Sequence, residues 1–469
     1  MTDKTTIKTS LSLKLFIIGF LIAILMIPTG MIAVLVNERE NRQENAFREV
    51  SEKWGLVQSI TGPVLSVPYK KIFESTVGNE KKVDEVLRYA HFLPEKLNVD
   101  GVINPEIRKR GIYEVVVYKT ELEISGEFVS PDFSNWEIAP EDIMHDKAFV
   151  SLGIPDMRGV KENINLKWND KEYAFKPGTE TNDIFSSGVN SKVAIDKDDK
   201  AKKYNFSLKL ILNGSRDLHF TPIGKETNVT IASEWPDPSF QGAFLPNTHE
   251  ISDQGFTASW KVLELNRNFP QSFLGALSRE PNAPVLRERF DEYAPATMQY
   301  NSFSSSDFGV RLLVVADEYQ KTVRALKYSI MLLSLTFLIL FFFEALNKKR
   351  VHPLQYILIG LSLSLFYVLL LSIAEHLGFD CAYFISVFSI VGLITLYSKS
   401  VFGVWKPAMI ESLILIFIYG FIYIILQLED YSLLVGALGL FVILSIVMYV
   451  SRKIDWYNVN SIKEDKAVN

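Results

Sequence analysis

The side chains best suited to acid–base or metal chemistry in the long central segment 37–324 are its histidines. His91, His145, His219 and His249 are scattered singly, outside any ligand or catalytic motif. A lone histidine is more often structural or exposed than a ligand, so we predict a structural role for each. Two of them could still meet in space and bind a metal, an alternative that spacing along the chain leaves open.

The sequence lacks the common signatures of hydrolases and nucleotide-binding enzymes. It contains no Gly-x-Ser-x-Gly elbow, no His-Glu-x-x-His pair, no P-loop and no dinucleotide fingerprint. We therefore predict a protein without enzymatic activity, with no catalytic residue, no cofactor and no metal site. A membrane-tethered hydrolase with an unrecognised site stays open as an alternative, because it would need only one pocket that joins a histidine and an acidic residue.

The most unusual segment outside the apolar runs is 233–246, which carries three prolines and three aromatic residues. Proline cannot donate to a strand ladder, so this segment is predicted to be a rigid loop that cannot pair as a central strand. It either packs over the sheet as a cap or forms a docking surface for a partner or glycan. The candidate docking residues are Trp235, Pro236, Asp237, Pro238, Phe240 and Phe244.

Six apolar runs divide the chain, one before the central segment and five after it. Each is close to the roughly 20 residues that a helix needs to cross a hydrocarbon core about 30 Å thick. We predict that each run is a transmembrane helix and that the first is an uncleaved anchor. The predicted spans are 15–36, 328–346, 354–374, 381–397, 408–428 and 431–450.

The basic residues indicate how the spans are oriented. Lys348, Lys349 and Arg350 follow the second span, whereas the connections 375–380 and 429–430 contain no Lys or Arg. Because cytoplasmic connections carry the excess of Lys and Arg, both termini are predicted to be cytoplasmic. This gives a cytoplasmic leader 1–14, an external domain 37–324 and a cytoplasmic tail 451–469.

The central segment is acidic. It holds 36 of the 49 Lys and Arg residues and 44 of the 54 Asp and Glu residues, a net charge of −8. A nucleic-acid partner would need a basic face, so nucleic acid is excluded. The single cysteine, Cys381, lies in the fourth span, so the central segment has no disulfide. The predicted partners are the lipid bilayer and an unidentified periplasmic protein, membrane protein or cell-wall component.

The central segment is predicted to be mainly β after a short helical stalk. Phe47, Val50, Trp54 and Val57 have helical spacing, so 38–60 is predicted to be an amphipathic helix. We favour packing against the base of the domain over the alternative, a helix that binds a partner. From Gly62 onward the residues alternate or are β-branched, as in 113–118 and 204–210, and turn signals such as 177–178 and 213–214 separate them. We predict antiparallel sheets in one large sandwich-like domain or two small ones.

Ionisable residues are few inside the predicted spans. Glu344 lies near the inner end of its span and is expected to pair with Lys348; Glu411 lies near the inner start of the fifth. Mid-span polarity is limited to small and hydroxyl residues such as Gly360 and Ser364, whose spacing suits close helix packing. No proton relay is predicted. The candidate membrane-interface residues are Glu344, His352, Glu375 and His376.

The chain resembles the CreD family of inner-membrane, cell-envelope-integrity proteins over nearly its whole length. The resemblance rests on long blocks that contain Trp, His and Pro, such as 341–344, 352–363, 374–379, 233–236, 245–246 and 455–457. It implies a bacterial inner-membrane protein linked to envelope integrity and, in some relatives, to an envelope-stress regulon and to antibiotic or colicin tolerance. It supplies no reaction and no active site.

The sequence therefore predicts a membrane protein with a bundle of six transmembrane helices and a large, mainly antiparallel β, periplasmic domain inserted between helices 1 and 2. Its predicted role is non-enzymatic support of envelope integrity or of the stress response, by docking a periplasmic partner or cell-wall component. A component of a small-molecule or lipid transporter is the first alternative.

Overall fold

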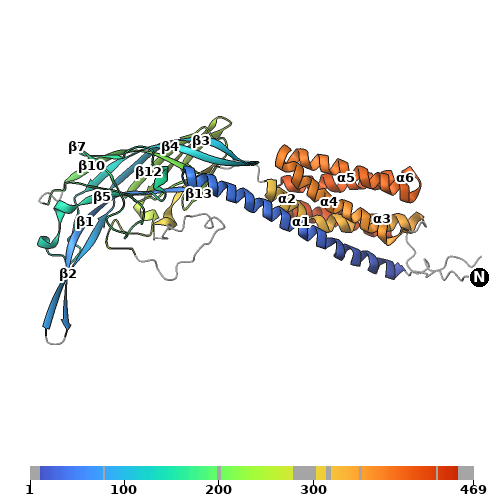
Figure 1. Cartoon of the computed structure of the whole chain (residues 1–469), viewed down its shortest axis with the longest axis horizontal. Coiled ribbons are helices and arrows are strands. Elements are labelled where there is room, and N and C mark those ends of the chain that lie inside the picture. The colour runs from blue at the N-terminus through green and yellow to red at the C-terminus, as the bar shows by residue number, and fades with distance from the viewer. Residues whose placement is uncertain are drawn as a thin grey trace, which may run out of the picture. The chain divides into compact units, whose positions relative to one another are not determined.

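The computed structural model describes residues 11–77, 80–197, 202–277, 303–312, 318–347, 351–428 and 431–452. The chain forms two compact units (Figure 1). One comprises Met1–Gln43 with Ala316–Asn469 and is helical; the other is Glu44–Val315 and consists mainly of strands. Helix α1, Leu11–Trp54, begins in the first unit and ends in the second.

The helical unit contains helices that are suited to a bilayer. Among the described residues, α1, α4, α5, α6 and α7 are long and apolar enough to cross a membrane, and α2 with α3 passes the same test as a pair bent by 44°. The count is thus five or six. The bounds are α2 Glu318–Lys327, α3 Ser329–Asn347, α4 Pro353–Leu377, α5 Phe379–Phe402, α6 Trp405–Gln427 and α7 Ser432–Ser451.

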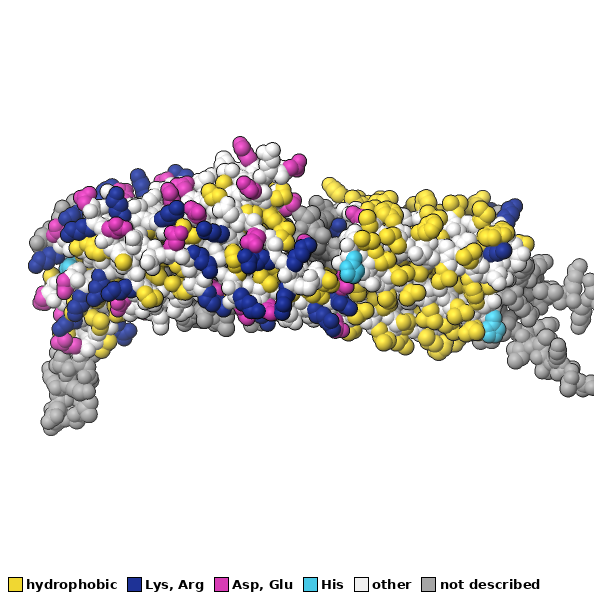
Figure 2. Space-filling view, turned by 45° about the horizontal axis from the view of Figure 1, so that its top comes forward, with side chains coloured by type: hydrophobic (Ala, Val, Ile, Leu, Met, Phe, Trp, Pro, Cys, Tyr) yellow, Lys and Arg dark blue, Asp and Glu magenta, His cyan; other side chains and the backbone are white. Residues whose placement is uncertain are grey.

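The surfaces of the two units differ in composition (Figure 2). Hydrophobic side chains cover the visible face of the helical unit, whereas Lys, Arg, Asp and Glu are spread over the β unit. Large exposed apolar residues such as Phe388, Phe417 and Phe441 lie on the helices. A continuous apolar surface on helices that satisfy their own backbone hydrogen bonds is the surface that lipid covers.

Helix α4 packs closely against its neighbours at Gly360. A Cβ atom added there would collide with the Leu25 side chain of α1 and lie 3.0 Å from Phe337 of α3. Ser364, one turn later, is buried and donates its hydroxyl to the Gly360 carbonyl at 3.2 Å. The predicted close helix contact at these residues is confirmed, because a Cβ atom at residue 360 would require the Leu25 side chain to move.

The β unit has two sheets. Their strands are β1 Gln58–Val77, β2 Glu80–Phe92, β3 Lys96–Arg110, β4 Tyr113–Val129, β5 Phe149–Gly153, β6 Asn165–Trp168, β7 Lys171–Ala174, β8 Lys176–Pro177, β9 Gly188–Lys192, β10 Lys203–Ser215, β11 Asp217–Phe220, β12 Glu226–Ser233, β13 Pro238–Gly242, β14 Thr248–Ser252, β15 Gly255–Leu263, β16 Ser272–Leu274 and β17 Phe308–Leu312. Short 3₁₀ turns, such as Pro140–Asp142, connect some of them.

One sheet has nine described strands along the path β13-β17-β11-β1-β5-β9-β8, and β2 and β16 lie off this path; the other has eight in the order β14-β15-β12-β3-β4-β10-β6-β7. Most pairs are antiparallel, and β1 with β11 and β3 with β12 are parallel. Both sheets contribute to a single hydrophobic core. The large mainly-β domain is confirmed, and it is one unit because both sheets bury the same core.

The core follows from period-two burial along the strands. In β12 partly exposed and buried residues alternate without interruption, so Val229 and Ile231 face inward. Aromatic rings fill the space near one end: Trp168 stacks on Tyr204 at 5.2 Å, and Phe128 lies 5.1 Å from Phe206. Such contacts add to area burial and join the neighbouring strands β4, β10 and β6 of the eight-stranded sheet.

The turn predicted at 213–214 is wrong. Both residues continue strand β10, where Gly214 pairs with Tyr118 of β4. A side chain at Gly214 would collide with the Tyr118 ring, so glycine is needed here for packing. The chain turns at Arg216, which has a φ of 62°.

The segment predicted as a stalk is helical as far as Trp54 and becomes strand β1 at Gln58. Phe47 packs with Val115 and Val117 of β4, and Val50 and Trp54 lie against the same cluster. The predicted packing of this segment against the domain's own base is confirmed.

Candidate functional site

The predicted docking loop contains strand β13, which ends the nine-stranded sheet. β13 pairs with β17 from Pro238↔Leu312 to Gly242↔Phe308. The prediction that this segment cannot be a central strand is confirmed. Pro238 is the first residue of β13. Strands tolerate proline at this position because its missing N–H is not needed for a hydrogen bond within the sheet.

The aromatic residues of the loop point into the domain. Trp235, Phe240 and Phe244 are partly buried against the main core. Phe240 lies edge-on to Phe256 at 5.9 Å and to Trp260 at 5.6 Å. The surface of the segment is formed instead by Pro236, Asp237 and Leu245, which is 72% exposed. The aromatic candidates therefore fix the segment in place, and Asp237 and Leu245 flank β13 on the outside.

Among the described strands, β13 pairs along one edge only. The Ala243 N–H donates to the Asp307 carbonyl at 2.8 Å. Hydrogen-bonded pairs alternate along an antiparallel ladder, so the N–H groups of Phe240 and Gly242 point away from β17. Among the described residues neither of these N–H groups has a hydrogen-bond partner. The arrangement offers two donors to a further strand.

Beside β13, one face of the sheet is polar. Ser59 of β1 and Thr221, which follows β11, donate their hydroxyls to the Asp307 carboxylate at 2.7 and 2.6 Å, and Thr61 lies 2.7 Å from Thr221. The register aligns His219 with Ser59 in the neighbouring strand. Within the described contacts His219 bonds neither Ser59 nor Asp307, so these residues do not form a catalytic triad.

Burial sets the charge state of this face. It raises the pKa of Asp307 from 3.8 to about 6, against the opposing effect of the Thr221 and Ser59 hydroxyls. It also lowers the pKa of His219, and Arg311 acts in the same direction while Asp217 opposes it. At neutral pH His219 is therefore uncharged.

An ion pair fastens β11 to β17 on the same face. The Arg311 guanidinium donates to both carboxylate oxygens of Asp217, at 2.5 and 3.0 Å, from the directly opposite position in the ladder. Both side chains are largely buried. Bidentate geometry gives such a pair its specificity.

His91 is joined to a serine and an aspartate. Its Nδ1 lies 2.8 Å from the Ser66 hydroxyl and its Nε2 lies 3.1 Å from the Asp183 carboxylate. The hydrogen bond with His91 lowers the pKa of Asp183. However, His91 is 0% exposed and Ser66 1%. A nucleophile must reach its substrate, so this chain of hydrogen bonds is structural.

The other histidines do not gather into a metal site. His249 packs on Phe240 at 5.5 Å, and His145 lies edge-on to Phe133 at 5.9 Å. Within the described part of the chain, no three His, Cys, Asp or Glu residues lie close enough to hold a metal ion.

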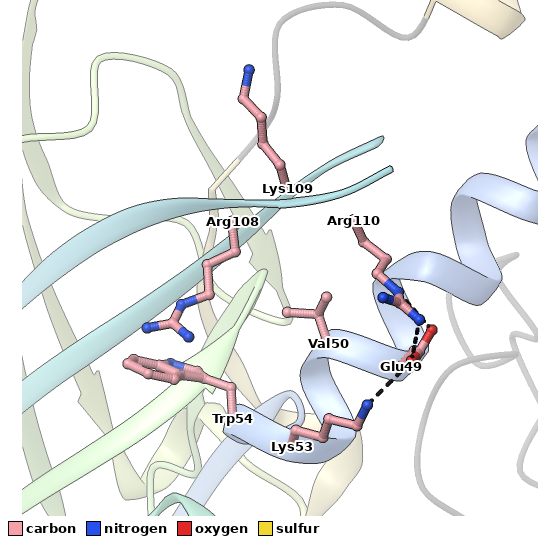
Figure 3. Close-up of a pocket in the computed structure, with 7 residues that line it drawn as sticks. All are labelled: Glu49, Val50, Lys53, Trp54, Arg108, Lys109 and Arg110. Carbon is pink, nitrogen blue, oxygen red and sulfur yellow. Dashed lines mark hydrogen bonds and ion pairs between the residues drawn. The ribbon is translucent and has the colours of Figure 1, made fainter. Parts of the chain in front are cut away.

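A groove of about 260 Å³ lies where the end of α1 meets the β3–β4 hairpin (Figure 3). Arg108 stacks on Trp54 at 3.8 Å, and Glu49 accepts hydrogen bonds from Arg110 and Lys53. Lys109 pairs with Glu114 at 2.9 Å. Each cation of the groove thus contacts a carboxylate or the Trp54 ring, and the groove joins the hairpin to α1.

Comparison with known proteins identifies the family. A family model described as "Inner membrane protein CreD" matches residues 10–457. The chain belongs to the CreD family. It is 33% identical over 442 residues to the inner membrane protein CreD of Escherichia coli strain K12, covering 93% of this chain and 91% of that protein.

A solved structure, an M1 zinc metallopeptidase from Deinococcus radiodurans, aligns with 36% of this chain and 38% of its own at 7% identity and a TM-score of 0.16. A TM-score this low does not indicate a shared fold. Membership of the CreD family together with the apolar helices makes this chain a multi-pass inner-membrane protein.

The membrane-interface candidates of this CreD family member have different roles. Glu344 is buried and forms an ion pair with Lys14, and Lys348, its expected partner, lies outside the described residues. His352 caps α4, where its Nδ1 accepts from the Leu354 N–H at 3.2 Å. Glu375 accepts from the Tyr319 hydroxyl at 3.1 Å.

His376 is exposed near the end of α4. The four membrane-interface candidates therefore do not form one site: Glu344 and His352 lie toward the Lys14 end of the bundle, whereas Glu375 and His376 close the other end of α4.

Sequence reasoning missed the polar face. Ser59 and Asp307 are 248 positions apart, and each sits in an unremarkable local sequence. Ser59 and Thr61 flank Ile60, an alternation typical of a strand face, but Ser59 lies in the segment 38–60 that is predicted to be helical.

Proposed function

We propose that this CreD family member is a non-enzymatic envelope protein with six membrane spans, cytoplasmic termini and a periplasmic β domain. In this proposal the β domain docks an extended segment of a periplasmic partner on the free edge of β13 and thereby supports envelope integrity. The free N–H groups of Phe240 and Gly242 are the observation that carries the docking role.

The charge pattern supports the orientation. Lys348, Lys349 and Arg350 follow α3, and Lys399 and Lys406 flank the α5–α6 connection, whereas the α6–α7 connection carries only Glu429 and Asp430. Under the positive-inside rule these clusters support a β domain on the outer side, inserted between α1 and α3 in the chain.

Cys381 provides a test of the orientation, because it is the only cysteine and is exposed near the start of α5. We expect a membrane-impermeant maleimide to label it in spheroplasts without permeabilisation. The matched control is Cys381→Ser with Ser400→Cys, which moves the thiol to an exposed position at the opposite end of the same helix. That variant should be labelled only after permeabilisation, and the reverse pattern would overturn the proposed orientation.

Strand addition fits the geometry of β13. The inward aromatic residues hold the strand rigid, so a partner does not have to order it on binding, which lowers the entropic cost of docking. The exposed Asp237 and Leu245 at its two ends are positioned to contact the flanks of an added strand.

Docking on β13 predicts the effect of surface changes at its two ends. We expect Asp237→Lys together with Leu245→Asp to weaken docking by roughly tenfold or more, about 1.4 kcal/mol. The protein should remain folded, because both side chains are on the surface. The measurement is complementation of the envelope sensitivity of a strain that lacks the protein, alongside its level in the membrane.

The matched control is Ile251→Asp, an exposed residue of β14, the end strand of the other sheet. It should complement fully. Loss of complementation by Ile251→Asp alone would place docking on β14, and full complementation by the β13 variant would reject the proposal.

A further inference from the structure

Five helices place one polar side chain each at the same end of the helical unit. Lys14 is near the start of α1, Glu344 near the end of α3, Tyr356 near the start of α4, Ser398 near the end of α5 and Glu411 near the start of α6. They lie in or next to the apolar segments, where polar groups are expensive and usually functional. None of the described helices carries another buried carboxylate at this end.

The first carboxylate of this cluster is fully compensated. Lys14 forms an ion pair with Glu344, and the Tyr356 hydroxyl donates to the second carboxylate oxygen of Glu344 at 3.2 Å. The partners come from α1, α3 and α4. Glu344 can therefore stay charged where it is buried, because a cation and a hydroxyl replace its hydration.

The second carboxylate, Glu411, has no such partners. Its side chain is 0% exposed, and neither carboxylate oxygen accepts a hydrogen bond from a described residue. The Ser398 side chain, also buried, lies beside it, and its hydroxyl interacts with this carboxylate. Tyr356 is near enough for an electrostatic interaction with Glu411.

The remaining charged groups at this end do not neutralise Glu411. Among the described residues, Lys399 lies over the Trp405 ring at 4.6 Å, Lys406 and His352 are exposed, and Arg452 stacks on Tyr449 at 5.3 Å. No described Lys, Arg or His forms an ion pair with Glu411. An unpaired carboxylate without hydration is strongly disfavoured inside a protein, whereas the protonated acid is neutral and can donate one hydrogen bond.

We propose that Glu411 is a proton-binding site of the helical unit, with Ser398 as the acceptor of the bound proton's hydrogen bond. Binding converts the Glu411 carboxylate and one proton from water into the carboxylic acid, and release reverses this step. Tyr356 lies near both carboxylates, because its hydroxyl donates to Glu344 and it interacts electrostatically with Glu411. A structural role alone would not require an ionisable residue at a position where no described cation pairs with it.

The test uses the full-length protein in detergent and dicyclohexylcarbodiimide, a reagent that reacts with protonated carboxyl groups in apolar surroundings. Mass spectrometry should find the adduct on Glu411 near neutral pH and at least tenfold less of it as the pH rises toward about 9. Glu344 should stay unmodified, because its ion pair keeps it charged. Ser398→Ala should shift the pH at which labelling of Glu411 is half-maximal, because it removes the hydroxyl that accepts the hydrogen bond from the protonated carboxyl.

Two variants make the result specific. Glu411→Gln should lose the adduct together with the protonated-carboxyl stretch in the infrared difference spectrum between acidic and alkaline pH. Glu344→Gln should keep both. The proposal is overturned if wild-type Glu411 is never modified, if its modification does not depend on pH, or if Glu344 is the residue labelled. The wild-type measurement decides these points even if Glu411→Gln fails to fold.

Discussion

Replacing Arg311 with methionine is expected to lower the free energy of unfolding of the β domain by about 3–5 kcal/mol. Arg311 holds Asp217 through two hydrogen bonds, and the side chains are only 15% and 7% exposed. Methionine is of similar length, so little packing is lost. The loss arises because the Asp217 carboxylate stays buried without its counter-charge.

The measurement is denaturant unfolding of the purified protein, followed by tryptophan fluorescence of the β domain. A second variant, Arg311→Met with Asp217→Leu, should recover most of the stability, because it removes both charges together. The matched control is Lys70→Met, which breaks an ion pair whose side chains are 41% and 59% exposed. That change should cost less than about 1 kcal/mol. Equal losses from Arg311→Met and Lys70→Met would contradict the buried-pair argument.

Asp307→Asn is expected to stabilise the β domain at neutral pH by about 1–3 kcal/mol, with the gain disappearing below about pH 4. Burial raises the pKa of Asp307 from 3.8 to about 6. Below pH 3.8 the Asp307 carboxyl is protonated in both the folded and the unfolded states, so its ionisation does not lower the free energy of unfolding. Between pH 3.8 and about 6 only the unfolded state loses it, and wild-type stability falls as the pH rises. Asparagine does not titrate, so the variant avoids this loss.

The lower values of the expected stabilisation allow for solvent that reaches the partly accessible Asp307 side chain and weakens the effect of burial. The comparison is the unfolding free energy of both proteins at a series of pH values between about 4 and 8. Asp156→Asn is the control, and its effect on the free energy of unfolding should have the opposite sign. Burial raises the pKa of Asp156, but hydrogen bonds from Arg158 and from the Leu56 N–H outweigh it and lower the pKa overall. Asp156→Asn should therefore destabilise the domain at neutral pH. A constant difference between Asp307→Asn and wild type across this range would contradict the prediction.

In the docking segment, local sequence predicts the position of the strand in its sheet but not the direction of its side chains. Its prolines predict that it cannot be a central strand, and β13 ends its sheet, because proline acts on the backbone of its own segment. The direction of Phe240 and Phe244 could not be predicted, because it depends on Trp260 and Phe308, which pair with β13 or pack beside it only in the folded domain.

The histidines show the same limit. Spacing along the chain predicts isolated residues, yet Ser66 and His91 are direct partners across β1 and β2 and Asp183 joins them from a distant loop. Burial then decides that the three are structural, and burial belongs to the whole domain rather than to any segment.

By itself, the sequence determined the properties that depend on neighbouring residues: the apolar runs long enough to cross a bilayer, the β patterning of the central segment, and membership of the CreD family through long local blocks. Tertiary structure alone decided which polar groups meet. Asp307 with Ser59, Arg311 with Asp217, and Glu411 without a partner all depend on contacts between distant elements. The physical reason is that hydrophobic periodicity is a local property of the chain, whereas the energy of a buried charge depends on everything that surrounds it.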